Sequence, residues 1–159
     1  MFKFTFLFFV FALFFSFLAE AETEEERIKF EVMAAFKSLV DASEKLDSRL
    51  YFEHFDKKKF VGLNSDGTNW NSINDLSALI TDGFEAIKII NSLEFTNVNI
   101  SVIDSYTAIL VNEYVQSMTL KSGNDMDLSG GGVQVWSKRS GEWKIVSVSA
   151  SNKPSGAIP

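Results

Sequence analysis

Apolar positions along the chain first follow a helical period. Between residues 23 and 46 they recur every three or four positions, which predicts a helix of about six turns. Thr23 and Glu26 form a capping-box pattern, and the acidic run at 22–26 suits the positive end of a helix dipole. The stripe on one face consists of Ile28, Val32, Phe36, Leu39, Val40, Ser43 and Leu46.

Two further helices and a short strand follow this segment. The pattern predicts a short helix at 48–55, a strand at 59–63 and, after a Ser-Asp-Gly-Thr turn at 65–68, a third helix. Ser72 and Asp75 supply a capping box for that third helix. Its apolar stripe consists of Leu76, Leu79, Ile80, Phe84 and Ile87.

From about residue 89 the apolar period becomes two, which is typical of strands. In a long, bent strand predicted at 90–103, Leu93 and Phe95 are odd-numbered, whereas Val98, Ile100 and Val102 are even-numbered. This change of parity predicts a β-bulge near Thr96 and Asn97. A second strand is expected at 106–121. Residues 130–151 then predict a hairpin, with a tight turn that contains Gly141 and a tryptophan on each side of it. Helices followed by an antiparallel meander indicate one α+β domain.

The N-terminal segment has the features of an export signal. Residues 1–21 combine the basic Lys3, an almost wholly apolar run at 4–18 and a final Ala-Glu-Ala triplet with small residues at its first and third positions. We therefore expect a signal peptide at 1–21, a domain at 22–152, a tail at 153–159, and a periplasmic or secreted protein without stable membrane insertion after cleavage. A membrane anchor is the alternative, although the apolar run is shorter than the roughly 20 residues that a spanning helix needs.

Composition excludes several classes of function. The net charge of −6 argues against nucleic acid as a partner, because phosphates require a basic surface. The chain has no cysteine, which excludes thiol nucleophiles and cysteine metal sites, and its one histidine excludes His-rich zinc sites. No cofactor and no metal site are predicted.

The C-terminal hairpin carries a resemblance to a known family. The turn that enters the strand at 106–121, the pair Val135 and Trp136, the segment 140–146 and a final Ser151 resemble the nuclear-transport-factor-2-like superfamily, especially its SnoaL-like proteins and the association domain of calcium/calmodulin-dependent kinase II. The similarity covers about residues 24–152. It implies a cone-shaped, bent antiparallel sheet wrapped around a long N-terminal helix, with two shorter helices and a pocket at the open end.

The sequence departs from this family where relatives carry catalytic groups. Many relatives alternate histidines on the last strand, but Ser147 and Ser149 stand there, and serine without a base is a poor acid or base near neutral pH. The steroid-isomerase branch has a carboxylate base where Asn64 stands here. Asp66 and His54 remain weak catalytic candidates, since Asp66 lies in a turn and His54 at a helix end.

A set of uncharged polar residues is the best candidate for a ligand site. The even-numbered face of the strand at 106–121 carries Ala108, Leu110, Asn112, Tyr114 and Gln116. The resemblance places this face inside the cone, where Gln134 and Trp136 on the next strand and Ser149 on the last would continue the lining. Such a lining suits a small, neutral or weakly polar organic ligand. Alternatively, these groups satisfy one another and bury water.

Two functions of different class follow from these residues. The first is an exported binding or assembly domain without clear catalytic residues. The second is an isomerase-, cyclase- or dehydratase-type enzyme that uses Tyr114 as a hydrogen-bond donor and Asp66 or His54 as a base. The first is favoured, and enzymatic activity stays an open question.

A homodimer is expected through the outer face of the sheet. This face should carry Ile109, Val111, Val115, Val133, Val135, Val146 and Val148. An antiparallel sheet with one wet face alternates apolar and polar residues, whereas this one is apolar on both sides at its centre. A two-fold partner is the simplest cover for such a patch, and dimers of this kind are common among the relatives.

Overall fold

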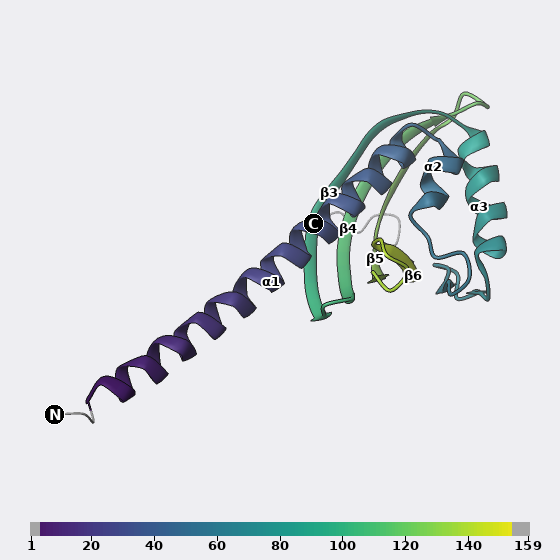
Figure 1. Cartoon of the computed structure of the whole chain (residues 1–159). Coiled ribbons are helices and arrows are strands. Elements are labelled where there is room, and N and C mark those ends of the chain that lie inside the picture. The colour runs from purple at the N-terminus through teal and green to yellow at the C-terminus, as the bar shows by residue number, and fades with distance from the viewer. Residues whose placement is uncertain (1–3, 154–159) are drawn as a thin grey trace.

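A strongly bent sheet curls around the second half of a long helix (Figure 1). This computed structural model describes residues 4–153, with side chains from residue 24 onward. The predicted α+β class is confirmed: the described chain contains three helices and six strands in one curled, open sheet. The first half of the long helix extends away from the sheet.

The helices are α1 (Phe4–Glu44), α2 (Ser48–Glu53) and α3 (Ile73–Ala86). The expected start of α1 at Thr23 is wrong, because the preceding apolar run contains no glycine or proline and continues the helix. The start of α3 is confirmed, since the Asp75 carboxylate accepts a hydrogen bond from the Ser72 backbone at 3.2 Å. Among the residues whose side chains are described, no helix has the length and apolar character to span a membrane.

The sheet is a four-stranded antiparallel meander extended by two short strands. Its strands are β1 (Val61–Leu63), β2 (Asn69–Trp70), β3 (Ile87–Asp104), β4 (Thr107–Leu120), β5 (Asp125–Ser137) and β6 (Lys144–Asn152). Their spatial order is β2-β1-β6-β5-β4-β3. β1 pairs in parallel with β6 and antiparallel with β2. β2 was not expected from the sequence.

Among the register shifts of the sheet, two change which side chains face inward near the cavity. The predicted bulge in β3 is confirmed, because the register with β4 shifts between Phe95 and Asn97. A second shift, between β5 and β6, was not expected: Trp136 pairs with Ile145, but Val135 pairs with Ser147. The extra residue in β6 reverses the alternation of the strand.

This reversal corrects two predictions about β6. Val148 lies inside the curled sheet rather than on its outer face, and it lines the interior cavity described below. Ser149, expected inside, lies outside beside Val133 and Val111. Nothing in the apolar pattern of β6 indicates the bulge. Regular alternation of faces from Ile145 onward therefore predicts the wrong face for Val148 and for Ser149.

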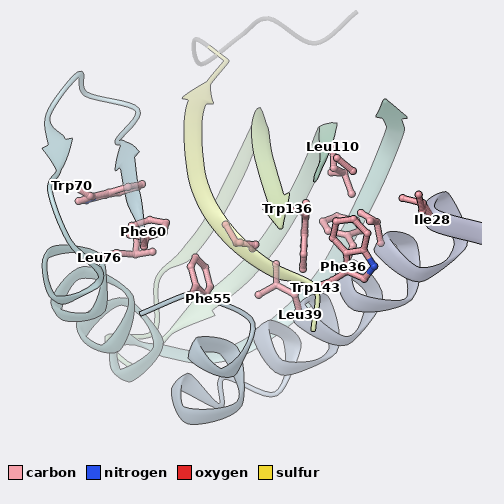
Figure 2. Packing of buried hydrophobic residues seen from close by; sticks show 13 residues of the cluster. Ile28, Phe36, Leu39, Phe55, Phe60, Trp70, Leu76, Leu110, Trp136 and Trp143 are labelled. Atoms are coloured by element: carbon pink, nitrogen blue, oxygen red, sulfur yellow. The ribbon is translucent and has the colours of Figure 1, made fainter. Parts of the chain in front are cut away.

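The core lies between α1 and the concave face of the sheet (Figure 2). The predicted stripe of α1 supplies its helical side, with Ile28, Val32, Phe36 and Leu39 all buried. The strands supply Ala108, Leu110, Trp136 and Ile145, none of which is measurably exposed. A second part of the cluster, with Phe60, Trp70 and Leu76, joins β1 and β2 to α3. Each large side chain buried in this way contributes about 1.5–3 kcal/mol.

A carboxylate on α1 fixes the helix to the β5–β6 hairpin. Oε2 of Glu31 accepts hydrogen bonds from Nε1 of Trp143 and Nζ of Lys138, both at 2.8 Å. Arg27, one turn earlier on the helix, pairs with the other oxygen of Glu31. These partners, Lys138 first and Trp143 second, lower the pKa of Glu31 from 4.5 to about 2.

We expect this carboxylate to make folding pH-dependent. Its folded pKa is lower than its unfolded pKa, so its contribution is complete above pH 4.5 and is lost as the pH falls towards 2. After allowance for partial exposure, the loss amounts to about 2 kcal/mol. Glu31→Gln should therefore flatten the decrease in unfolding free energy between these pH values, measured by urea denaturation at several pH values.

Glu53→Gln is the matched control, because Glu53 is an exposed carboxylate that pairs with Arg49 on the surface of α2. This control should keep the wild-type pH profile. If Glu31→Gln also kept it, the Glu31 contacts would contribute nothing to the acid dependence of stability.

Candidate functional site

A cavity of about 380 Å³ lies between the helices and the concave face of the sheet. Phe36, Leu39 and Val40 of α1 form one wall, and Leu76, Ile80 and Phe84 of α3 form another. The strands add apolar side chains that include Leu93 and Phe95. The cavity is therefore the part of the concave space that the core does not fill.

Glycines in β5 leave room for two polar side chains of β4. Tyr114 pairs across the sheet with Gly130, and Asn112 pairs with Gly132. A Cβ atom at Gly130 would lie 3.1 Å from the Tyr114 ring and 2.3 Å from the backbone oxygen of Ser151, so no other residue fits without rearrangement. The glycine run, ambiguous in the sequence, thus shapes the cavity wall.

Three of the five predicted ligand-binding residues meet in this cavity. Asn112, Tyr114 and Gln134 line it together, as strand parity and the family shape imply. The Tyr114 hydroxyl donates to Oδ1 of Asn152 at 3.3 Å, and burial raises the pKa of Tyr114. Its phenol therefore stays protonated at neutral pH and is a hydrogen-bond donor.

The two amides differ in how they are held. Asn112 is 6% exposed, and its side chain forms no hydrogen bond with any other described residue. In contrast, Oε1 of Gln134 accepts a hydrogen bond from Nε1 of Trp136 at 3.0 Å. One amide is thus free in the cavity wall and the other is oriented by the core.

The other two predicted ligand residues lie elsewhere. Trp136 is completely buried behind Gln134 and belongs to the core cluster rather than to the cavity lining. Ser149 lies on the outer face of the sheet because of the β6 bulge. Their places beside the cavity are taken by Val148 and Ala150 of β6.

The sequence analysis missed Tyr51, an aromatic lining residue from α2. Its ring contacts Phe55 and Phe84 with centroid distances of 5.2 and 5.6 Å. Burial raises the pKa of Tyr51 to about 12, so this phenol is also neutral. A six-residue helix has too little periodicity to indicate which of its aromatic residues faces the cavity.

The weak catalytic candidates do not line the cavity. Asp66 is exposed in its turn, where its carboxylate accepts from the backbone and the hydroxyl of Thr68 at 2.9 and 2.6 Å. These bonds lower the pKa of Asp66. His54 lines a separate polar hollow with Glu53 and Lys144, and burial followed by the charge of Lys144 lowers its pKa.

The residues that line the main cavity are all uncharged at neutral pH within the described part of the chain. Its polar groups are amides and hydroxyls, and the remainder of the wall is aliphatic or aromatic. Such a wall can bury an apolar ligand and orient it with a few hydrogen bonds. It offers no carboxylate or imidazole to remove a proton.

Solved structures with the same fold include one named as a candidate dehydratase and one named as an association domain. A nuclear transport factor 2-like protein from Salmonella enterica superposes with a TM-score of 0.72 at 16% identity, covering 84% of this chain and 96% of its own. A candidate dehydratase from Streptomyces avermitilis gives 0.71 at 14% identity, covering 82% and 99%. The association domain of calcium/calmodulin-dependent protein kinase II from C. elegans gives 0.65 at 19%, covering 80% and 97%.

These likenesses confirm the nuclear-transport-factor-2-like fold that the C-terminal hairpin indicated, and at such identities they show the fold alone. No curated protein matches the sequence. The SnoaL-like domain family, in contrast, matches residues 32–154, which include the C-terminal third of α1 and the whole sheet. The chain therefore belongs to the SnoaL-like domain family.

Proposed function

We propose that the protein is an exported binding domain that holds a small, neutral or weakly polar organic ligand without clear catalytic residues. The observation that carries this proposal is the cavity wall, which combines Asn112, Tyr114 and Gln134 with apolar side chains and no charged group among the described lining residues. A charged ligand would lose its hydration there without gaining a counter-ion. A neutral ligand loses little hydration free energy and is stabilised by burial of its apolar surface.

An enzyme of the dehydratase type is the second candidate. The fold of the Streptomyces avermitilis candidate dehydratase supports it, as does the protonated phenol of Tyr51, which can donate a hydrogen bond to a substrate; the Tyr114 hydroxyl would first have to leave Asn152. Such a reaction also needs a base, and Asp66 and His54 lie outside the cavity lining. Binding without proton abstraction is therefore favoured.

We further propose that two copies associate through the outer face of the sheet. Val111, Val115 and Val133 are each at least 40% exposed on this face, although Val148 does not contribute to it. The fold shared with a kinase association domain supports self-association. The Glu113–Lys153 ion pair lies at the same face and would give a partner a polar contact.

Occupancy of the cavity can be tested with a pair of neighbouring substitutions in β6. Ala150→Leu adds volume inside the cavity, whereas Ser149→Leu adds the same side chain on the outer face. N-phenyl-1-naphthylamine, a neutral dye that fluoresces in apolar surroundings, should bind the wild-type protein, and Ala150→Leu should weaken binding at least tenfold. Fluorescence titration measures the affinity.

Ser149→Leu should keep wild-type affinity for the dye. Equal loss in both variants would mean that the dye binds elsewhere or that the substitutions act through the fold. Absence of dye binding to the wild-type protein would count against a ligand-binding function.

Self-association can be tested with a charge placed on the outer face. Val111→Lys should convert a dimer into a monomer, because a dimer would have to bury an additional ammonium group beside a carboxylate, Glu113, that already pairs with Lys153. Sedimentation velocity at micromolar concentration measures the change. Phe30→Lys, at a 76% exposed position of α1, is the control and should leave the dimer intact. A wild-type monomer under these conditions would refute the proposed interface.

Export predicts a shortened N-terminus. The protein released by the cell should begin near Glu22, as the Ala-Glu-Ala triplet after the apolar segment implies. N-terminal sequencing of the released protein measures this directly. An intact Met1 recovered only from membranes would instead identify the segment as an anchor.

A further inference from the structure

Aromatic rings surround the cavity on several sides. They come from α1, α2, α3, β2, β3 and β4 and are Phe36, Tyr51, Phe84, Trp70, Phe95 and Tyr114. Phe36 meets Phe95 edge-on at a centroid distance of 4.9 Å, and Phe95 lies 6.3 Å from Tyr114. At these spacings the rings pack on one another, and the ring surfaces that remain toward the cavity can contact a flat ligand by stacking or edge-to-face packing.

Trp136 determines which group Gln134 presents to the cavity. An indole N–H can only donate, so the atom of Gln134 that lies 3.0 Å from Nε1 of Trp136 is the carbonyl oxygen. The indole is completely buried in the core and cannot turn away. The amide nitrogen of Gln134 is therefore left as a donor, and it forms no hydrogen bond with another described residue.

Asn112 lies close enough to act with Gln134. Asn112 pairs with Gly132, two residues from Gln134 on β5, so the two amides are diagonal neighbours on the inner face, separated by roughly 7 Å at the backbone. Gly132 places no side chain between them. More than nine-tenths of Asn112 is buried, yet no described side-chain nitrogen or oxygen is both fully buried and without a hydrogen-bond partner, so the amide of Asn112 reaches the open space of the cavity. A ligand that fills the cavity would exclude water from this amide and would therefore have to form a hydrogen bond with it.

We infer that the cavity is specific for flat, neutral compounds with a carbonyl oxygen, which accepts hydrogen bonds from the amide nitrogens of Gln134 and Asn112. Trp136 is a positioning residue that keeps Gln134 in its donor orientation. This inference rests on the proposed binding function and adds the chemical class of the ligand. A carboxylate is excluded from this class because no described lining residue carries a positive charge.

Three compounds with one ring system separate these requirements: methyl 2-naphthoate, naphthalene and 2-naphthoate. They share the flat ring and differ in having a neutral carbonyl, no carbonyl, or a charged carboxylate. Displacement of N-phenyl-1-naphthylamine from the full protein measures the affinity of each compound. The ester should bind, and 2-naphthoate should bind at least tenfold more weakly than the ester.

Substitution of Gln134 should weaken the binding of the ester, which has a neutral carbonyl, and not that of naphthalene. Gln134→Leu replaces the amide by an apolar side chain of similar volume. It should weaken the affinity for the ester about fivefold and leave the affinity for naphthalene unchanged. Trp136→Phe should also reduce the ratio of the affinity for the ester to the affinity for naphthalene, because it releases Gln134 from its donor orientation. Trp136 itself does not line the cavity. Gln116→Leu is the matched control, since it removes another lining amide, and it should change the ratio less than twofold.

The outcomes distinguish this inference from the function on which it rests. Equal responses of the ester and naphthalene to Gln134→Leu would overturn carbonyl recognition while leaving a binding cavity. Carbonyl recognition by Gln134 would also be overturned if Gln116→Leu lowered the ester-to-naphthalene affinity ratio as much as Gln134→Leu does. Failure of the wild-type protein to bind the dye would refute both proposals. Should Trp136→Phe fail to fold, the Gln134 and Gln116 variants still decide between these results.

Discussion

Burial of one stripe of α1 against the concave sheet is the interaction on which the other elements depend. Phe36 and Leu39 belong both to the buried core and to the cavity wall, so the helix closes the core and bounds the empty space at the same time. The helix is held at a fixed angle because Glu31 binds Trp143 and Lys138 on the hairpin. A shift of α1 would therefore change the core, the hairpin contact and the cavity together.

The polar groups of the cavity oppose the stability of this arrangement. The side chain of Asn112 faces the cavity and forms no hydrogen bond with another described residue, so it forgoes the stabilisation that an apolar side chain would gain there. A leucine there would suit an apolar core better. Proteins carry such a cost mainly at functional sites, where local rules of folding are broken and a gain in binding compensates.

Much of the fold could be predicted from the sequence because its signals are local. The change of parity at Thr96 indicated the β3 bulge, and Ser72 with Asp75 indicated the start of α3. The bulge in β6 could not be predicted, because valine and serine alternate through it and the extra residue is defined only by pairing with β5. For the same reason Asn112, Tyr114 and Gln134 were placed correctly and Ser149 was not: the first three precede the slip in register.

The position of the last strand has a consequence for how the chain folds. β6 is the last element of the described residues but lies between β1 and β5, so within the described sheet it alone joins the first short strands to the meander. Ile145 also bonds to the backbone of His54 and Asp56, about ninety residues earlier in the chain. Contacts this distant form slowly, because a long loop must close first. A nascent chain cannot complete its sheet until synthesis has passed β6, and it therefore stays incompletely folded while its N-terminal segment is already available to other factors.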